Sequence, residues 1–201
     1  MTSVILALLL GVSVSRSAAV NAISVKQSEI ASKLTASAKQ KLLPIVPLAK
    51  TSTDLKTAIK QAFPKTELSD DDIAILAFYV VAEASSATQI EMKSIADEID
   101  KMKNQKIEVQ KTLEGKEQPP ATMSKVRAIG PNDYYRAPAS LAADAPLPQL
   151  VQRLADLGAM SDANQNRVHS LMSEKSQFDT RLSTMFTKIA QMDLSTLLSI
   201  K

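Results

Sequence analysis

The feature that most constrains this chain is a stripe of apolar residues between Leu150 and Thr196. Alternating steps of four and three residues from Leu150 meet thirteen positions, and nine of them are apolar. A spacing of about 3.5 residues keeps one helix face directed at a partner helix, as in a coiled coil. We therefore predict a long helix that needs a helical partner, with contacts at Leu171, Phe178, Leu182, Met185, Ile189 and Met192.

A second stripe with the same spacing runs from Phe78 to Leu113, and eight of its eleven positions are apolar. The two stripes can cover each other, which favours an antiparallel hairpin with arms at about residues 70–113 and 150–200. Parallel association of two copies also satisfies both stripes, because a long linker separates the arms. Contacts in the first arm are expected at Phe78, Met92, Ile95, Ile99 and Met102.

The composition favours helices over sheets. Aromatic residues make up 3% of the chain, Trp is absent and there are only 4 Gly. β-Sandwiches draw on β-branched and aromatic residues, whereas this apolar content lies largely in Ala, Leu, Ile, Val and Met. We predict an all-α fold: a long antiparallel, coiled-coil-like helical hairpin with short N-terminal helices. Its segments are a signal peptide (1–22), a basic N-terminal helical segment (23–68), a first long helix (69–113), a Pro-rich linker (114–149) and a second long helix (150–201).

The first segment has features of a signal peptide. The apolar run Val4–Val14 is shorter than the roughly 20 residues of a membrane-spanning helix, but it suits the hydrophobic region of a signal peptide. No Lys or Arg precedes the run, so an apolar helix that stays attached is the alternative. We predict cleavage after Ala22 and export to the periplasm, the cell surface or the medium.

Charge is distributed unevenly along the N-terminal half. Eight lysines and two acidic residues give residues 26–65 a net charge of +6, and residues 66–90 carry −5. We expect these segments to attract each other or neighbouring copies, and an anionic membrane is the alternative partner. Nucleic acid is disfavoured, because the basic segment has no Arg and only one aromatic residue, Phe63.

The clearest helix start is at Ser69. With Asp72 three residues later it matches a capping box, and Asp70 and Asp71 suit the positive end of the helix dipole. A divalent-cation site in this acidic cluster is the alternative, but it lacks the alternate ligand spacing and the Gly turn of calcium loops. We predict that the cluster caps the first long helix.

Other local patterns set further expectations. Short helices are expected at about 30–42, ended by Pro44 and Pro47, and at about 53–63. Residues 73–82 are apolar on all sides, so they are buried on several sides or lie in an oligomer interface. Gly158 can end one helix, and Ser161 and Asp162 can cap another. Six polar residues in the stripes either fix register or lie at the edge of a drifting stripe, namely Ser85, Thr88, Lys106, Ser161, Asn164 and Lys175.

The linker holds six of the 9 prolines, and its densest patch contains Tyr134, Tyr135 and Arg136. Tyr and Arg often anchor protein interfaces, so these three residues are candidates for contact with another protein. The alternative is that both tyrosines fold back over the end of the hairpin.

Residues with catalytic potential are sparse. The chain has no Cys, and His169 is its only His, so neither a catalytic triad nor a His-based metal site can be assembled. Carboxylates such as Glu98 alternate with lysines, as on a solvated helix face. We predict a non-enzymatic protein with no catalytic, cofactor or metal site, and an exposed His169.

The layout of two apolar-striped arms, 69–113 and 150–201, around a divergent centre resembles the exported helical-hairpin subunits of bacterial type III secretion filaments and translocators. Those proteins are likewise poor in Cys. The resemblance implies polymerisation through the arms and an exposed region at 119–148. Substrates of that pathway are not expected to carry a cleavable signal such as 4–22, and the resemblance assigns no functional residue.

Together these patterns predict an exported structural, assembly or protein-interaction subunit that associates through its helical stripes. The alternative is a membrane-associated or membrane-active helical protein. In that case residues 4–14 and 73–82 would supply apolar surfaces, and the lysines of residues 26–65 would face anionic headgroups.

Overall fold

The computed structural model describes residues 21–50, 54–114, 134–139, 145–192, 194, 195, 197 and 200. The described part contains helices and connecting segments and no strand, which confirms the all-α prediction. The chain divides into two compact units. Unit 1 comprises residues 1–87 and 174–201, and unit 2 comprises residues 88–173. The predicted signal-peptide run at residues 4–14 lies outside the described residues.

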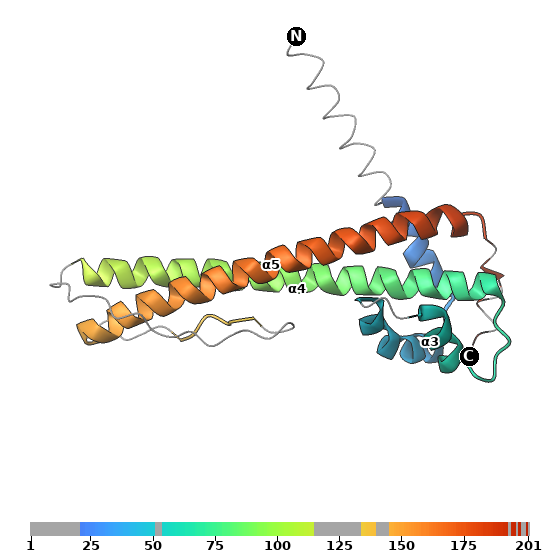
Figure 1. Cartoon of the computed structure of the whole chain (residues 1–201), viewed down its shortest axis with the longest axis horizontal. Helices are drawn as coiled ribbons and strands as arrows, with labels where there is room; N and C mark the ends of the chain where they lie inside the picture. Colours follow the sequence, from blue (N-terminus) through green and yellow to red (C-terminus); the bar gives the residue numbers. More distant parts are fainter. Residues whose placement is uncertain are drawn as a thin grey trace, which may run out of the picture. The chain divides into compact units, whose positions relative to one another are not determined.

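Two long helices, α4 (Asp70–Leu113) and α5 (Leu147–Ile189), each contribute to both units (Figure 1). Within unit 2, Glu91 of α4 pairs with Arg167 of α5, whereas Gln105 further along α4 pairs with Arg153, which comes earlier in α5. The order is reversed, so the helices are antiparallel. The predicted helical hairpin is therefore confirmed, and the stripes are paired within one chain.

The start of α4 follows the predicted capping box. The Ser69 hydroxyl accepts a hydrogen bond from the Asp72 amide at 3.1 Å, and the Asp72 carboxylate accepts from the Ser69 amide at 3.0 Å and from its hydroxyl at 2.6 Å. These bonds satisfy amide groups that no helical carbonyl can reach. Asp70 and Asp71 complete an acidic first turn.

The second helix differs from the prediction at both ends. α5 begins at Leu147, three residues earlier than expected. Pro148 is accepted in the first turn because a backbone amide at that position would have no helical carbonyl to bond. It ends at Ile189 instead of continuing to Ile200, so the predicted helix over 150–201 is wrong in its last part. The chain beyond it returns to the core of unit 1, where three apolar side chains become buried: Leu194, Leu197 and Ile200.

The suggested helix break near Gly158 is also absent. α5 continues through this residue, which does not adopt a positive φ. A side chain there would meet only the end of Lys106, 3.9 Å away. Gly158 therefore weakens the helix locally without ending it.

Unit 1 surrounds the first part of α4 with short helices. They are a helical segment at 21–33, α2 (Ala36–Leu42), the 3-10 helix η1 (Leu43–Lys50) and α3 (Leu55–Ala62). The single helix predicted at about 30–42 is interrupted at Thr35, whose hydroxyl caps α2 by accepting from the Ala38 amide at 3.1 Å. Pro44 and Pro47 lie within η1, consistent with their predicted effect of ending the α-helix.

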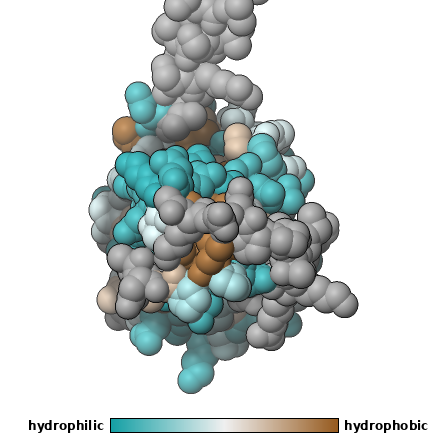
Figure 2. Space-filling model, turned by 90° about the vertical axis from the view of Figure 1, so that its left-hand side faces the viewer, coloured by the Kyte–Doolittle hydropathy of each residue, from teal (hydrophilic) through white to brown (hydrophobic). Residues whose placement is uncertain are grey.

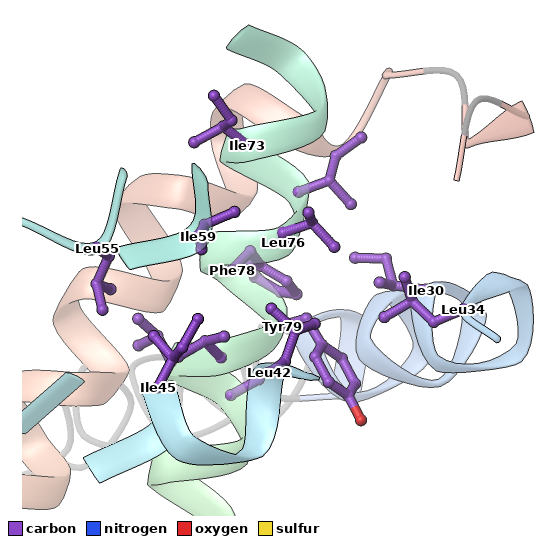
Figure 3. Packing of buried hydrophobic residues seen from close by; sticks show 14 of the residues in the cluster. Ile30, Leu34, Leu42, Ile45, Leu55, Ile59, Ile73, Leu76, Phe78 and Tyr79 are labelled. Carbon is purple, nitrogen blue, oxygen red and sulfur yellow. The ribbon is translucent and has the colours of Figure 1, made fainter. Parts of the chain in front are cut away.

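These elements bury the stretch of α4 that is apolar on all sides. Phe78 is fully buried, and Figure 3 shows it within the cluster near Ile59 and Leu76. Burial on several sides is therefore confirmed for this stretch. Predicted contact residues of α5 join the same core directly or pack against it, namely Phe178, Leu182, Met185, Ile189 and, just after the helix, Met192.

Candidate interaction site

Unit 2 is built on the paired residues 88–113 of α4 and 147–173 of α5. Their apolar contacts form two small clusters. One contains the predicted residues Ile95, Ile99 and Leu171, with Met92 packed against it. The other is larger and contains Met102, Val109, Leu113, Ala145, Leu150 and Leu157. The predicted apolar contacts of this part of the hairpin thus lie inside it.

An extended segment at residues 134–139, which we call the strip, lies along both helices of unit 2 (Figure 1). Asn164 of α5 holds it at Tyr135 through two hydrogen bonds. The Tyr135 amide donates to Asn164 Oδ1 at 2.9 Å, and Asn164 Nδ2 donates to the Tyr135 carbonyl at 2.8 Å. A single side chain therefore satisfies both backbone groups of one residue in the strip.

Three further side chains bind the backbone of the strip. Glu98 Oε2 accepts from the Ala137 amide at 2.7 Å, and Gln105 Nε2 donates to the Pro138 carbonyl at 2.7 Å. Arg153 donates to the Ala139 carbonyl. Glu98 and Gln105 come from α4, whereas Asn164 and Arg153 come from α5. Both arms of the hairpin therefore hold the same segment by its main chain.

The two tyrosines of the strip pack on the apolar clusters. Tyr134 lies against the Ile95–Ile99–Leu171 cluster, and its hydroxyl is 2.9 Å from Ser94 Oγ. Tyr135 packs on the other cluster, and its buried hydroxyl has no hydrogen-bond partner among the described residues. Both tyrosines therefore fold back on the hairpin, as in the alternative interpretation, but Tyr134 lies along its arms beside Ser94 and not over its end. Arg136 is exposed, and its contact with another protein stays a prediction.

Some polar positions in the stripes are buried, as residues that fix register would be, and others lie at the edge of a stripe. Thr88 and Asn164 are fully buried, and Ser85 is nearly so, as expected of residues that fix register. In unit 1, Ser85 lies 3.3 Å from Asp179 and 3.4 Å from Lys175. Lys106 is exposed and lies at the edge of its stripe, and Ser161 is partly buried.

Glu98 is the charged member of the site whose titration is shifted. The Lys101 amine, 2.7 Å from Glu98 Oε1, lowers the pKa of this carboxyl, and the hydrogen bond from the Ala137 amide lowers it further. Glu98 therefore remains ionised at neutral pH. An ionised carboxylate is a stronger hydrogen-bond acceptor for a backbone amide than a neutral group.

A second charged pair lies in the same unit. Arg167 Nη2 is 2.7 Å from Glu91 Oε1, and the two side chains are 11% and 25% exposed. Arg167 Nε is buried without a hydrogen-bond partner in the described part of the chain. Breaking such a pair leaves a partly buried charge uncompensated, so it favours the observed register of the two helices.

In unit 1 the basic N-terminal segment is partly neutralised. Lys56 reaches Asp70 at 2.9 Å, an ion pair between the oppositely charged segments noted above. Lys26 pairs with Glu29 at 3.2 Å, and Lys50 pairs with Glu174 at 2.9 Å. The attraction between these two segments therefore operates at least partly within the chain.

The site offers hydrogen bonds and apolar contact to a peptide main chain. Among the described residues, no group of three or more His, Cys, Asp or Glu could hold a metal ion, and His169 is exposed on α5. Most of the described surface visible in Figure 2 is hydrophilic, with a narrow apolar area in its middle. The arrangement of unit 2 suits the recognition of an extended peptide.

Sequence patterns identified only part of this site. Asn164 stood out as a polar position in an apolar stripe, but its bonds to Tyr135 were not expected. Glu98 was interpreted as part of a solvated face, and its pairing with Lys101 is consistent with that, yet its other oxygen binds the strip. Gln105 and Arg153 carried no signal, because polar residues outside a stripe are ordinary on helices.

Searches against protein-family models, curated proteins and solved structures found no match to this chain.

Proposed function

We propose that this chain is an exported, non-enzymatic helical subunit that associates with further copies of itself. The observation that supports this most directly is the use of side chains from both arms of unit 2 to bind a peptide main chain. Main-chain recognition of this kind is a general mode of protein–protein association. Export rests on the apolar run at 4–14.

The paired stripes change the expected route of association. Because the apolar stripes of α4 and α5 pack within each unit, these stripes are not free to form a coiled coil with another chain. Self-association therefore uses surfaces other than the stripes or an exchange of segments between copies. Filament growth through exposed stripes, as the resemblance to secretion subunits implied, is less consistent with this pairing.

The test is the molar mass of the chain, from Ile23 onward, measured by light scattering across a concentration series. We expect the mass to rise from that of a monomer to that of a dimer or larger assembly. A constant monomer mass up to the solubility limit contradicts self-association. A parallel measurement in high salt shows whether surface charge contributes, since exposed ion pairs weaken as salt rises.

A membrane-associated function is the second candidate. By length and composition, α4 could cross a membrane, although the core helix of a soluble protein passes the same test and 61% of the apolar window is buried. In unit 1 this apolar stretch is covered by the short helices. Flotation with anionic liposomes at physiological salt separates the two candidates: we expect no binding, and flotation of the folded chain would favour the membrane function.

A further inference from the structure

We propose that the paired helices of unit 2 form a binding site for an extended peptide, which the strip occupies within its own chain and the strip of a second copy occupies in the assembled protein. The site comprises Ser94, Glu98 and Gln105 of α4 with Arg153 and Asn164 of α5. This inference rests on the self-association proposed above and identifies the surface that carries it.

The strip is held through its main chain. Its bonds to Asn164, Glu98, Gln105 and Arg153 all involve backbone groups. Backbone groups are the same in every extended segment, so these contacts do not depend on whether the segment belongs to the same chain. Main-chain bonds supply affinity in such sites, and side-chain pockets supply selectivity. Here the selectivity comes from Tyr134 and Tyr135, which pack on the two apolar clusters.

The bonds that the strip donates follow the repeat of an extended chain. The amides of Tyr135 and Ala137 both donate to the helices, two residues apart, which matches the two-residue repeat of an extended chain. Asn164 is fully buried and presents both of its polar atoms to one residue of the strip. The site therefore recognises a segment in one conformation and one register.

The length of chain on either side of the strip limits how far the strip can reach. Residues 114–133 separate the strip from α4, and residues 140–146 separate it from α5. At about 3.3–3.6 Å per residue, these connections span at most roughly 70 Å and 25 Å. They are long enough to carry the strip to a neighbouring copy. The identical segment of that copy can make the same hydrogen bonds and apolar contacts, so a second copy is the occupant that needs no contact beyond those observed.

Competition within the chain sets the condition for exchange. A tethered segment acts at an effective concentration on the order of millimolar, so the chain's own strip occupies the site in dilute solution. Binding from a second copy becomes favourable at high local concentration or when the resident strip is weakened.

The probe is a fluorescein-labelled peptide with the sequence of residues 132–141, titrated with the full chain and followed by fluorescence anisotropy. A Tyr134→Ser/Tyr135→Ala variant weakens the resident strip and leaves the side chains of the helices intact. We expect it to bind the peptide at least tenfold more tightly than the unmodified chain. Adding Asn164→Ala to this variant removes both hydrogen bonds to Tyr135 of the peptide and should weaken peptide binding at least tenfold.

The matched control is Asn166→Ala in the same background. Asn166 is exposed and lies two residues from Asn164 on the same helix, so its loss should leave the peptide affinity unchanged. Circular dichroism of every variant establishes that helicity is retained. Equal affinities for the Asn164→Ala and Asn166→Ala variants, or no peptide binding to the weakened-strip variant, would overturn the proposed site.

Two further outcomes separate this inference from the proposed function. If the chain self-associates but the peptide does not bind, assembly uses another surface and only the binding site is wrong. If the peptide binds but the chain stays monomeric, self-association and the second copy as occupant are both wrong. A scrambled peptide of the same composition that binds equally well also overturns the assignment to a second copy, because it shows recognition of any extended segment.

Discussion

The two units share α4 and α5, but different forces hold them together. Unit 1 buries Phe78, Phe178 and their neighbours in one large apolar cluster that the short helices enclose. Unit 2 divides its apolar residues between two smaller clusters and contains two fully buried polar residues, Thr88 and Asn164. Apolar burial is non-directional and favours stability, whereas a satisfied buried polar group favours one arrangement over others.

This difference indicates a division of labour along one helical hairpin. In unit 1, the stretch of α4 that is apolar on all sides, residues 73–82, is covered by the chain's own N-terminal helices. In unit 2, a six-residue strip covers the hairpin and is bound through its main chain. Few apolar contacts and exchangeable hydrogen bonds are features of segments that open at low free-energy cost. We therefore expect unit 2 to open before unit 1 unfolds.

The largest expected effect is that of Phe78→Ala in unit 1. Removing a fully buried aromatic side chain creates a cavity and should lower the free energy of unfolding by about 3–5 kcal/mol. Urea denaturation followed by circular dichroism measures this change. Ile90→Ala is the control, because Ile90 is 71% exposed on the same helix, and we expect it to change stability by less than about 0.5 kcal/mol. Equal effects of the two substitutions would contradict the assignment of the core to unit 1.

Asn164→Ala should have the next largest effect, confined to unit 2. It leaves the Tyr135 amide and carbonyl without their partner, which costs about 1–3 kcal/mol when such groups stay buried. We expect faster amide hydrogen exchange at Tyr135 and Ala137, with exchange in the core of unit 1 unchanged. Asn166→Ala serves again as the exposed control. Faster amide hydrogen exchange in both units would mean that the loss of the Asn164 side chain is not confined to unit 2.

The sequence was most informative where a structural signal is local or periodic. The capping box at Ser69 and the alternating apolar spacing predicted the start of α4 and the pairing of the arms, because both depend on residues a few positions apart. The apolar spacing also continues to Met192, so it could not show that the helix stops at Ile189. Leu194 and Leu197, beyond that end, are buried in the core of unit 1, a contact between residues distant in sequence.

The main-chain bonds of the strip could not be predicted for a different reason, although Tyr134 and Tyr135 marked the segment as a candidate contact. These bonds are made by backbone groups, which every residue except proline carries equally, so no sequence pattern indicates that the amides of Tyr135 and Ala137 are bound. The side chains that bind them are ordinary polar residues of helices. Only Asn164 was detectable, since a fully buried amide within an apolar stripe needs a partner. A polar residue within an apolar stripe therefore indicates that a hydrogen-bond partner must lie there, but it does not identify the partner.

Ser69→Ala tests the local signal at the start of α4. It removes the hydroxyl that accepts from the Asp72 amide and donates to the Asp72 carboxylate, and caps of this kind contribute about 1 kcal/mol. We expect a loss of about that size in unit 1, measured by urea denaturation. Ser183→Ala, at an exposed position within α5, should leave stability nearly unchanged. A loss of unfolding free energy as large as that of Phe78→Ala would mean that the cap stabilises the core of unit 1 as well as the first turn of α4.

The smallest expected effect is a pH dependence of the strip in unit 2. Lys101 and the Ala137 amide lower the pKa of Glu98 below the ordinary 4.5, so its ionised form favours the bound strip. This contribution is present above pH 4.5 and is lost as the pH falls through the lowered pKa of the folded state. The chemical shift of the Ala137 amide in an NMR titration should report the loss.

Two substitutions distinguish this titration from general acid unfolding. Glu98→Gln keeps an oxygen that can accept from the Ala137 amide but cannot ionise, so the shift of that amide should lose its acid transition. Lys101→Ala removes the largest cause of the lowered pKa, so the transition should move up toward pH 4.5. A transition that stays at the same pH in both variants would assign the effect to other carboxylates. In that case charge would not contribute to holding the strip, and the main-chain bonds from Asn164 and Gln105 would account for the difference between the units.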